Sequence, residues 1–335
     1  MLFRRLGASG PLVSAIGLGC LGMSEGYGAP HSEDRKESIA TIQAALDNGL
    51  NLIDTADFYG SGHNEMLIGE ALQGGRRDRA ILGLKFGVLR DPAGGLNGGL
   101  DNRPAAIRNY LAYTLKRLGV DYIDVYRPAR LDPAVPIEDT VGAIADLVRA
   151  GYVRHIGLSE VGAATIRRAA AVHPIVDLQI EYSLLERRLE GDILDTCREL
   201  GIAITAYGVL ARGLLGGHLE RSPPTEDYRS FSPRFQGDNL RANLELAESL
   251  RSAAAGWRAT PAQAAIAWVL AQGDDIIPLV GVRSRARLNE AIAATELKPT
   301  IADLQRVAIA VPPGAAVGAA FPPDHSSVGK PENSA

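Results

Sequence analysis

The chain alternates short apolar runs with longer segments whose apolar residues recur every three or four positions. Several of the short runs are apolar at consecutive positions, which is the pattern of strands covered on both faces. Eight runs have this strand-like character, at residues 15–21, 50–54, 80–85, 122–126, 154–159, 176–181, 201–207 and 276–282. Because parallel strands need helical crossovers, the alternation indicates a parallel sheet connected by helices.

The segments between the runs predict helices. In residues 102–119, Pro104 suits the first helical turn and Gly119 suits the cap that follows the last turn. Residues 33–48 place isoleucine and leucine side chains on one face, and residues 261–272 follow a threonine that suits an N-terminal cap.

The eight alternations predict a (β/α)8 TIM barrel of the α/β class, preceded by a short β-hairpin around residues 7–10. A doubly wound sheet is the alternative. No linker divides the chain, so we expect one barrel domain over residues 1–310. A long loop is expected at 216–239, and an irregular or partly disordered tail at 311–335.

Composition narrows the possible partners. The 335 residues carry a net charge of -4, which argues against a surface for nucleic acid or acidic membranes. No apolar run is long enough to span a membrane, and the N-terminus lacks a signal-peptide core. Cys20 and Cys197 make no disulfide framework, which fits a cytoplasmic protein. The six histidines show no metal-ligand spacing, so no metal site is expected.

Three residues with chemical potential lie at or after neighbouring strand ends. Asp54 ends the second run, Tyr59 lies in the loop after it, and Lys85 ends the third run. Because a barrel of this kind carries its site where the strands end, these three side chains are expected to converge. They form either a catalytic group or an Asp54–Lys85 salt bridge beside a packed phenol, and spacing alone leaves both open.

A wider set of motifs resembles the aldo-keto reductases, in their branch of bacterial, fungal and plant members. The resemblance covers residues 1–310 and rests on seven stretches in order: GLGCLGMS, NLIDTADFYGSGHNEMLIGEAL, YIDVYRPARLDP, GYVRHIGLSE, QIEYSLLER, TAYGVLARGLLGG and IIPLVGVRSRARLNEAI. It implies NADPH-dependent reduction of a small aldehyde or ketone by hydride transfer. Tyr59 would be the proton donor, Lys85 would lower its pKa, and Asp54 would hold Lys85 in place.

The same resemblance implies the coenzyme contacts, since no G-x-G-x-x-G motif supports a Rossmann site. By motif, Gly22 and Met23 would line the nicotinamide, Ser159 and Gln179 would hold its carboxamide, and Tyr207 would stack on its ring. Glu160 replaces an asparagine that is common in the family.

The remaining implied contacts lie at the pyrophosphate and at the adenosine end of the coenzyme. Leu210, Arg212 and Gly213 would lie near the pyrophosphate. Arg283, with Ser284 and Arg287 beside it, would meet a 2'-phosphate and favour NADPH over NADH, because a guanidinium forms paired hydrogen bonds with phosphate. Glu290 would contact the adenine.

One position departs from the family pattern, because Ala129 stands where a histidine usually aims the carbonyl. Arg127, water or a neighbouring side chain could fill the gap, the larger pocket could admit a different substrate or reduction, or the protein could be a nucleotide-binding relative with little turnover. The rival functions are a nucleotide sensor similar to channel-associated β-subunits, and a barrel isomerase or lyase that uses Lys85 as a Schiff base.

Overall fold

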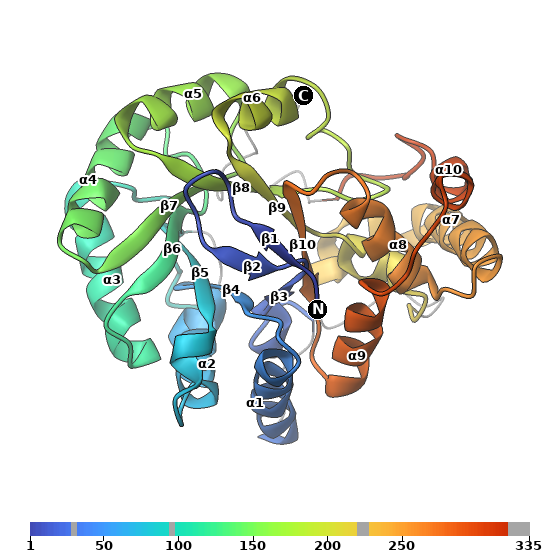
Figure 1. Cartoon of the computed structure of the whole chain (residues 1–335), viewed down its shortest axis with the longest axis horizontal. Coiled ribbons are helices and arrows are strands. Elements are labelled where there is room, and N and C mark those ends of the chain that lie inside the picture. Colours follow the sequence, from blue (N-terminus) through green and yellow to red (C-terminus); the bar gives the residue numbers. More distant parts are fainter. Residues whose placement is uncertain (28–31, 94–97, 220–227, 321–335) are drawn as a thin grey trace.

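Eight parallel strands close into a barrel in the computed structural model, which describes residues 1–27, 32–93, 98–219 and 228–320 (Figure 1). The strands are β3 (Gly17–Gly19), β4 (Leu52–Ala56), β5 (Ile81–Phe86), β6 (Ile123–Pro128), β7 (Val153–Ser159), β8 (Ile175–Glu181), β9 (Ala203–Tyr207) and β10 (Ile276–Gly281). They are hydrogen-bonded in chain order, and β10 pairs with β3 to close the ring. The predicted TIM barrel is confirmed, and a doubly wound open sheet is excluded.

An antiparallel hairpin covers the amino end of the barrel, as the sequence predicts. Its strands β1 (Phe3–Arg5) and β2 (Leu12–Ser14) cross the centre of the barrel in Figure 1. Leu6 and Val13 from the hairpin are fully buried in the apolar cluster that fills this end of the barrel. Arg4 fixes the hairpin by donating to the backbone carbonyls at the end of α8 and the start of β10.

Helices connect the strands on the outside of the barrel. They are α1 (Ser32–Asp47), α2 (His63–Ala71), α3 (Pro104–Leu118), α4 (Ile137–Arg149), α5 (Ala163–Val172), α6 (Asp192–Leu200), α7 (Gly237–Ala255), α8 (Pro261–Leu270), α9 (Arg285–Ala294) and α10 (Ile301–Ala310). The predicted ends of α3 are confirmed, because Pro104 opens the helix and Gly119 follows it with a left-handed φ of 66°. Thr260 caps α8 and accepts a hydrogen bond from the backbone of Gln263.

The segment expected to be one long loop, 216–239, contains more structure than the sequence suggests. Short 3-10 turns lie at Tyr228–Phe231 and Pro233–Phe235, and α7 already begins at Gly237. Residues 220–227 of this segment lie outside the described residues.

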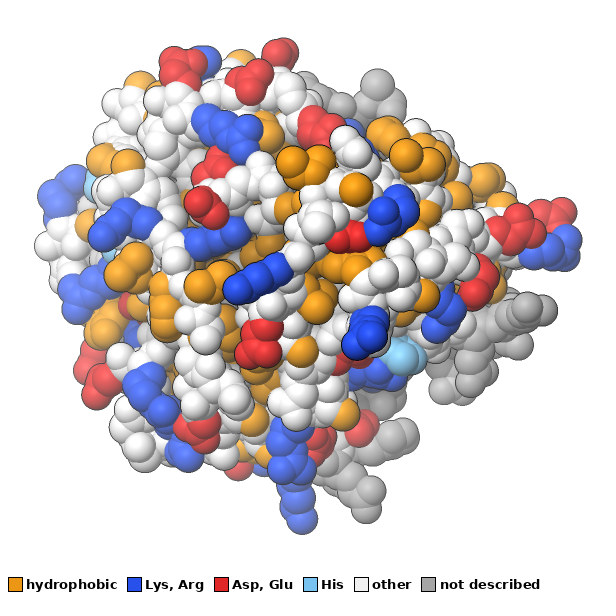
Figure 2. All heavy atoms as spheres, turned by 45° about the vertical axis from the view of Figure 1, so that its right-hand side comes forward, with side chains coloured by type: hydrophobic (Ala, Val, Ile, Leu, Met, Phe, Trp, Pro, Cys, Tyr) orange, Lys and Arg blue, Asp and Glu red, His pale blue; other side chains and the backbone are white. Residues whose placement is uncertain are grey.

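The last described part of the chain follows α10, which packs beside α7 at the right of Figure 1. Residues 311–320 form no helix or strand, and the rest of the predicted tail lies outside the described residues. The division into one domain and a tail stays a prediction. Among the described helices, none combines the length and hydropathy that crossing a membrane requires. On the face drawn in Figure 2, basic and acidic side chains are interspersed with each other and with apolar ones.

Candidate active site

The interior of the barrel changes from apolar to polar toward the carboxyl ends of the strands. Parallel register places Asp54 of β4 beside Gly83, and Lys85 of β5 beside Arg127 of β6. Because alternate residues of a strand face the same side, these side chains enter the barrel interior above the apolar cluster. Asp177 of β8 joins them, and all four charged side chains are at most 8% exposed.

Lys85 and Asp54 form the ion pair that the sequence predicts. The Lys85 ammonium donates to Asp54 Oδ2 at 2.5 Å and to the backbone carbonyl of Thr55 at 3.0 Å. Burial lowers the pKa of Lys85, and the carboxylate of Asp54 opposes this fall. The ion pair is expected both for a catalytic group and for a salt bridge beside a packed phenol. The surroundings of Tyr59 therefore distinguish these two alternatives.

Tyr59 begins a short 3-10 turn directly after β4 and faces this ion pair. The Lys85 nitrogen lies 5.1 Å from the centre of the Tyr59 ring. The side chain is half-buried, and within the described part of the chain its hydroxyl has no hydrogen-bond partner. The hydroxyl is therefore available to a bound molecule, although the ring packs edge-to-face against Phe58 with 5.0 Å between ring centres.

The acidity expected of Tyr59 is wrong for this structure. Burial, followed by the charge of Asp54, raises the pKa of Tyr59 well above its usual value of about 10. The Lys85 ammonium, which was expected to lower this pKa, lies over the ring and is paired with Asp54, so burial dominates. Arg130 is the group whose charge most opposes the rise.

Arg127 connects the two buried carboxylates below the site. Its Nη1 donates to Asp54 Oδ1 at 2.9 Å, and its Nη2 donates to Asp177 Oδ2 at 2.8 Å. Thr205 adds a hydrogen bond of 2.7 Å to the same oxygen of Asp177. Because both of its amino groups are engaged with carboxylates, Arg127 does not take the place of the histidine that the family usually has at position 129. Burial raises the pKa of Asp177, and Arg127 opposes this rise.

Two residues expected to hold a carboxamide lie beside this network. The hydroxyl of Ser159 is buried and has no partner within the described residues. Gln179 donates from Nε2 to Asp54 Oδ1 at 2.7 Å, so it is tied to the ion-pair network. An unsatisfied buried hydroxyl beside a glutamine amide fits a ligand that can both donate and accept hydrogen bonds.

Glu160 takes a defined role in place of the family's asparagine. Its Oε1 accepts a hydrogen bond of 2.6 Å from the Tyr207 hydroxyl and one of 2.9 Å from the backbone of Glu181. Its backbone is left-handed, with a φ of 54°. Burial, followed by the charge of Glu160, raises the pKa of Tyr207 well above its usual value. The Tyr207 ring is thereby fixed at the end of β9.

The residues expected at the pyrophosphate lie in the 3-10 turn Ala211–Gly216. Arg212 has a φ of 60° and Gly213 a φ of 93°, so the chain turns sharply there. The Arg212 guanidinium forms a two-pronged ion pair with Glu181 at 2.7 and 3.0 Å. Leu210, directly before the turn, is half-buried. The Arg212 side chain is thus held by Glu181, and the contact of this turn with a pyrophosphate stays a prediction.

The residues expected at the nicotinamide and at the 2'-phosphate approach each other. Gly22 and Met23 form a 3-10 turn after β3, and a Cβ on Gly22 would lie 3.3 Å from the Tyr27 ring and 3.5 Å from the Arg283 side chain. Arg283 itself is exposed and donates to the Tyr27 carbonyl at 2.8 Å.

The start of α9 organises the other adenosine-end residues. Ser284 caps the helix, and its side chain accepts from the backbone of Arg287. Arg287 pairs with Glu290 at 3.1 Å, while the Thr260 hydroxyl donates to the other oxygen of Glu290 at 2.7 Å. Arg285 differs from its neighbours, because it pairs with Glu37 at 2.9 Å. Arg283 forms no ion pair with a described carboxylate, so it is the better candidate for a phosphate, and the role of Arg287 stays a prediction.

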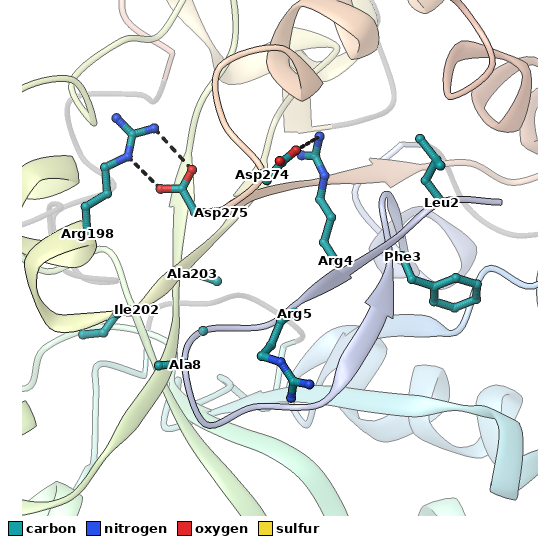
Figure 3. A pocket seen from close by; sticks show the side chains of 12 residues that line it. Leu2, Phe3, Arg4, Arg5, Ala8, Arg198, Ile202, Ala203, Asp274 and Asp275 are labelled. Atoms are coloured by element: carbon teal, nitrogen blue, oxygen red, sulfur yellow. Dashed lines mark hydrogen bonds and ion pairs between the residues drawn. The ribbon is translucent and has the colours of Figure 1, made fainter.

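A cavity of about 680 Å³ lies far from these residues, between the hairpin and the amino ends of β9 and β10 (Figure 3). Arg198 and Asp275 pair across one of its sides, and Arg4 pairs with Asp274. We place the candidate site at the carboxyl end, because catalytic residues in TIM barrels follow the carboxyl ends of the strands. Among the described residues, no group of histidine, cysteine, aspartate and glutamate side chains could hold a metal ion.

The sequence analysis missed Arg130, the residue after Ala129. Its half-buried guanidinium donates to the Ala129 carbonyl at 2.7 Å and forms no ion pair with a described carboxylate. The pKa shifts of Tyr59, Tyr207 and Lys85 all include its charge as a contribution. Its place two residues after the end of β6, next to Ala129, was the available signal.

Fold and site together define a (β/α)8 barrel protein with a buried ion pair and an adjacent phenol at the carboxyl ends of its strands. Comparison with known proteins identifies the family. The model of the Aldo/keto reductase family matches residues 15–311. The chain is 41% identical over 318 residues to the probable aldo-keto reductase 1 of Glycine max, covering 95% of this chain and 91% of that one.

Solved structures agree with this match. The glycerol dehydrogenase from Gluconobacter oxydans superposes with a TM-score of 0.81 at 29% identity, covering 92% of this chain and 94% of that one. The holo form of an aldo-keto reductase from Bacillus halodurans gives a TM-score of 0.74 at 30% identity, with 93% and 96% covered. The chain therefore belongs to the aldo/keto reductase family, which consists of oxidoreductases that act on carbonyl groups and use nicotinamide coenzymes.

Proposed function

We propose that this protein reduces an aldehyde or ketone to an alcohol with NADPH, and that Tyr59 donates the proton. The observation that carries the proposal is the half-buried Tyr59, whose ring centre lies 5.1 Å from the nitrogen of Lys85 in the buried Lys85–Asp54 pair and whose hydroxyl has no hydrogen-bond partner among the described residues. A phenol held only for packing would satisfy its hydroxyl or leave it in bulk water.

The raised pKa of Tyr59 suits the direction of reduction. A phenol with a high pKa stays protonated at neutral pH, so it can donate to the carbonyl oxygen as negative charge develops there. An alkoxide is about as basic as hydroxide and more basic than a phenolate, so the proton moves from phenol to alkoxide. Lys85 and Arg130 then stabilise the phenolate until it is reprotonated from water.

The residues of this chain fit a nicotinamide coenzyme. When bound, the coenzyme would supply the hydride. Ser159 offers a buried hydroxyl that has no partner among the described residues for the carboxamide, and Tyr207 offers a ring fixed by Glu160. Arg283 offers an exposed guanidinium for a 2'-phosphate directly before α9, where the backbone N–H groups of Arg285 and Arg287 already donate to Glu37 and Ser284. These features support NADPH as the preferred coenzyme.

Tyr59→Phe tests the proton donor. We expect this variant to lose about 100-fold or more of the turnover of a small aromatic aldehyde, because general acid catalysis contributes about 10²–10⁴-fold. NADPH affinity should stay within about threefold, since the hydroxyl is not assigned to the coenzyme. NADPH oxidation and fluorescence titration measure the two effects. Full turnover in Tyr59→Phe would remove the proposed role.

Arg283→Ala tests the coenzyme preference. We expect Kd for NADPH to rise about tenfold or more, while Kd for NADH changes little, because only NADPH carries the 2'-phosphate. Arg285→Ala is the matched control, since Arg285 is paired with Glu37. Equal losses for both coenzymes in Arg283→Ala would defeat the proposed phosphate contact.

Ala129 favours a second candidate function, a nucleotide sensor with little turnover. An alanine methyl cannot donate to a carbonyl oxygen, and Arg127 is committed to Asp54 and Asp177. Tight NADPH binding without turnover across a broad aldehyde panel would favour the sensor over the reductase.

A further inference from the structure

We propose that Arg130 binds a carboxylate on the substrate, so that the preferred substrates are aldehydes or ketones that carry a carboxylate a few carbons from the carbonyl. This inference rests on the proposed reductase function and names its substrate class. Arg130 would then orient the substrate, which the methyl group of Ala129 cannot do.

The position of Arg130 is fixed by its backbone. Its carbonyl accepts a hydrogen bond of 2.8 Å from the side chain of Asn102, which itself donates from its backbone to Asp132. Its Nη1 donates to the Ala129 carbonyl at 2.7 Å. The guanidinium is therefore held at the end of β6, on the rim where Tyr59 and Tyr207 also lie.

The charge of Arg130 acts within the catalytic group. Burial is the main cause of the raised pKa of Tyr59 and Tyr207 and of the lowered pKa of Lys85. Arg130 opposes both rises and adds to the fall, so its guanidinium lies within electrostatic range of all three groups. A ligand anion bound by Arg130 would therefore lie at the same end of the barrel as the proton donor.

The nearby carboxylates are occupied by other partners. Glu25 pairs with Arg90 at 3.0 Å. Asp132 accepts from the backbones of Asn102 and Ala134. Within the described residues, no carboxylate therefore neutralises Arg130.

The Glu160 carboxylate on the same rim is also engaged. Its Oε1 accepts from Tyr207 and from the Glu181 backbone. Its Oε2 has no hydrogen-bond partner among the described residues, and the guanidinium that forms an ion pair with it is that of Arg188, at 3.9 Å.

The guanidinium of Arg130 is also incompletely satisfied. Its Nε is buried and has no partner within the described residues. A half-buried charge without a counterion is costly, and an unpaired N–H adds to this cost. The planar fork of a guanidinium matches the two oxygens of a carboxylate, which would satisfy both the charge and the free N–H groups. A neutral carbonyl compound would satisfy neither.

Matched pairs of aldehydes test the proposal on the full-length protein with NADPH. Succinate semialdehyde is compared with butanal, and 4-carboxybenzaldehyde with benzaldehyde, by their kcat/KM ratios. We expect the native protein to favour the acid of at least one pair by roughly tenfold or more, as a charge-assisted pair provides. Arg130→Gln should bring that ratio close to one, and Arg130→Lys should restore part of it. The ratio separates substrate orientation from a general loss of structure.

A control variant and a binding measurement keep the test decisive. Arg149→Gln removes an exposed guanidinium on α4 and should leave the ratio unchanged. Binding of 4-carboxybenzyl alcohol to the NADP-loaded protein is measured by calorimetry in native protein and Arg130→Gln. Weaker binding of the alcohol by Arg130→Gln supports the proposal even if turnover is absent. An absence of turnover would contradict only the proposed reductase function. Equal ratios for native protein and Arg130→Gln, or equal binding when neither turns over, would overturn it.

Discussion

The two halves of the barrel interior are built from the same strands but from opposite kinds of side chain. The amino half is an apolar cluster of Leu6, Val13, Leu52, Val125, Val176, Ala203, Ile277 and Leu279. The carboxyl half, two residues further along, contains charged and polar groups instead. On β4 the change is from Leu52 to Asp54, and on β6 it is from Val125 to Arg127.

The difference separates stability from chemistry. Apolar side chains in the amino half stabilise the fold by removing surface from water. Buried charges in the carboxyl half rarely improve on apolar packing, because desolvation offsets their attraction. Their retention is explained if Asp54 and Lys85 serve a reaction, and Arg127 is needed to neutralise the two buried carboxylates that it joins. Each half then predicts a different outcome when a residue is removed.

Arg127→Leu should produce the largest loss of stability. The substitution leaves Asp54 and Asp177 buried beside each other without the guanidinium, and breaking a buried ion pair costs about 3–5 kcal/mol. Denaturant unfolding measures the loss, and Arg149→Leu on the surface of α4 serves as the control. A loss of stability below about 1 kcal/mol would mean that water solvates the charged groups in the carboxyl half of the barrel interior.

Leu52→Ala should affect stability alone. Leu52 is 1% exposed in the amino half, and removing a buried leucine side chain costs about 2–5 kcal/mol. Turnover per folded molecule should stay within about twofold of native, because the side chain contacts the hairpin end of the barrel rather than the site. Reductase assays well below the unfolding temperature check this. A large fall in turnover would show that the two halves are not independent.

The sequence predicts the amino half of the barrel interior and the order of the strands better than it predicts the charged groups of the carboxyl half. Apolar runs and caps such as Pro104 and Thr260 reveal elements, because their causes are local. The Asp54–Lys85 pair is also predictable, since both residues end neighbouring strands. Arg127 is harder, because its partner Asp177 lies 50 residues away.

The direction of the Tyr59 pKa shift could not be predicted from the sequence. Motif matching gives the neighbours of the phenol but not the depth of its burial or the side of the ring that Lys85 covers. The role of Arg130 was missed for a related reason. The motif directs attention to the absent histidine at 129, whereas an unpaired guanidinium becomes visible only once the partners of the surrounding carboxylates are known.

Asp57 gives the smallest and most selective test of the comparison. It follows β4 in the carboxyl half, and its Oδ1 is buried with no partner in the described part of the chain. Burial, followed by the charge of Glu65, raises the pKa of Asp57 from 3.8 to about 8, although Arg117 opposes the rise. The folded protein therefore keeps this proton at neutral pH, whereas the unfolded chain releases it.

This difference in proton binding determines how the stability of Asp57→Asn, relative to the native protein, changes with pH. The native protein has the full stability contribution of Asp57 below pH 3.8 and loses it as the pH rises toward about 8, by up to about 1.4 kcal/mol per pH unit. The asparagine variant does not titrate, so its stability relative to the native protein should increase by at least about 1 kcal/mol between pH 5 and pH 8. Paired denaturant unfolding at the two pH values measures this change. A constant difference between variant and native protein would show that Asp57 is ionised in the fold, and that the carboxyl half contains a charge which its neighbours stabilise.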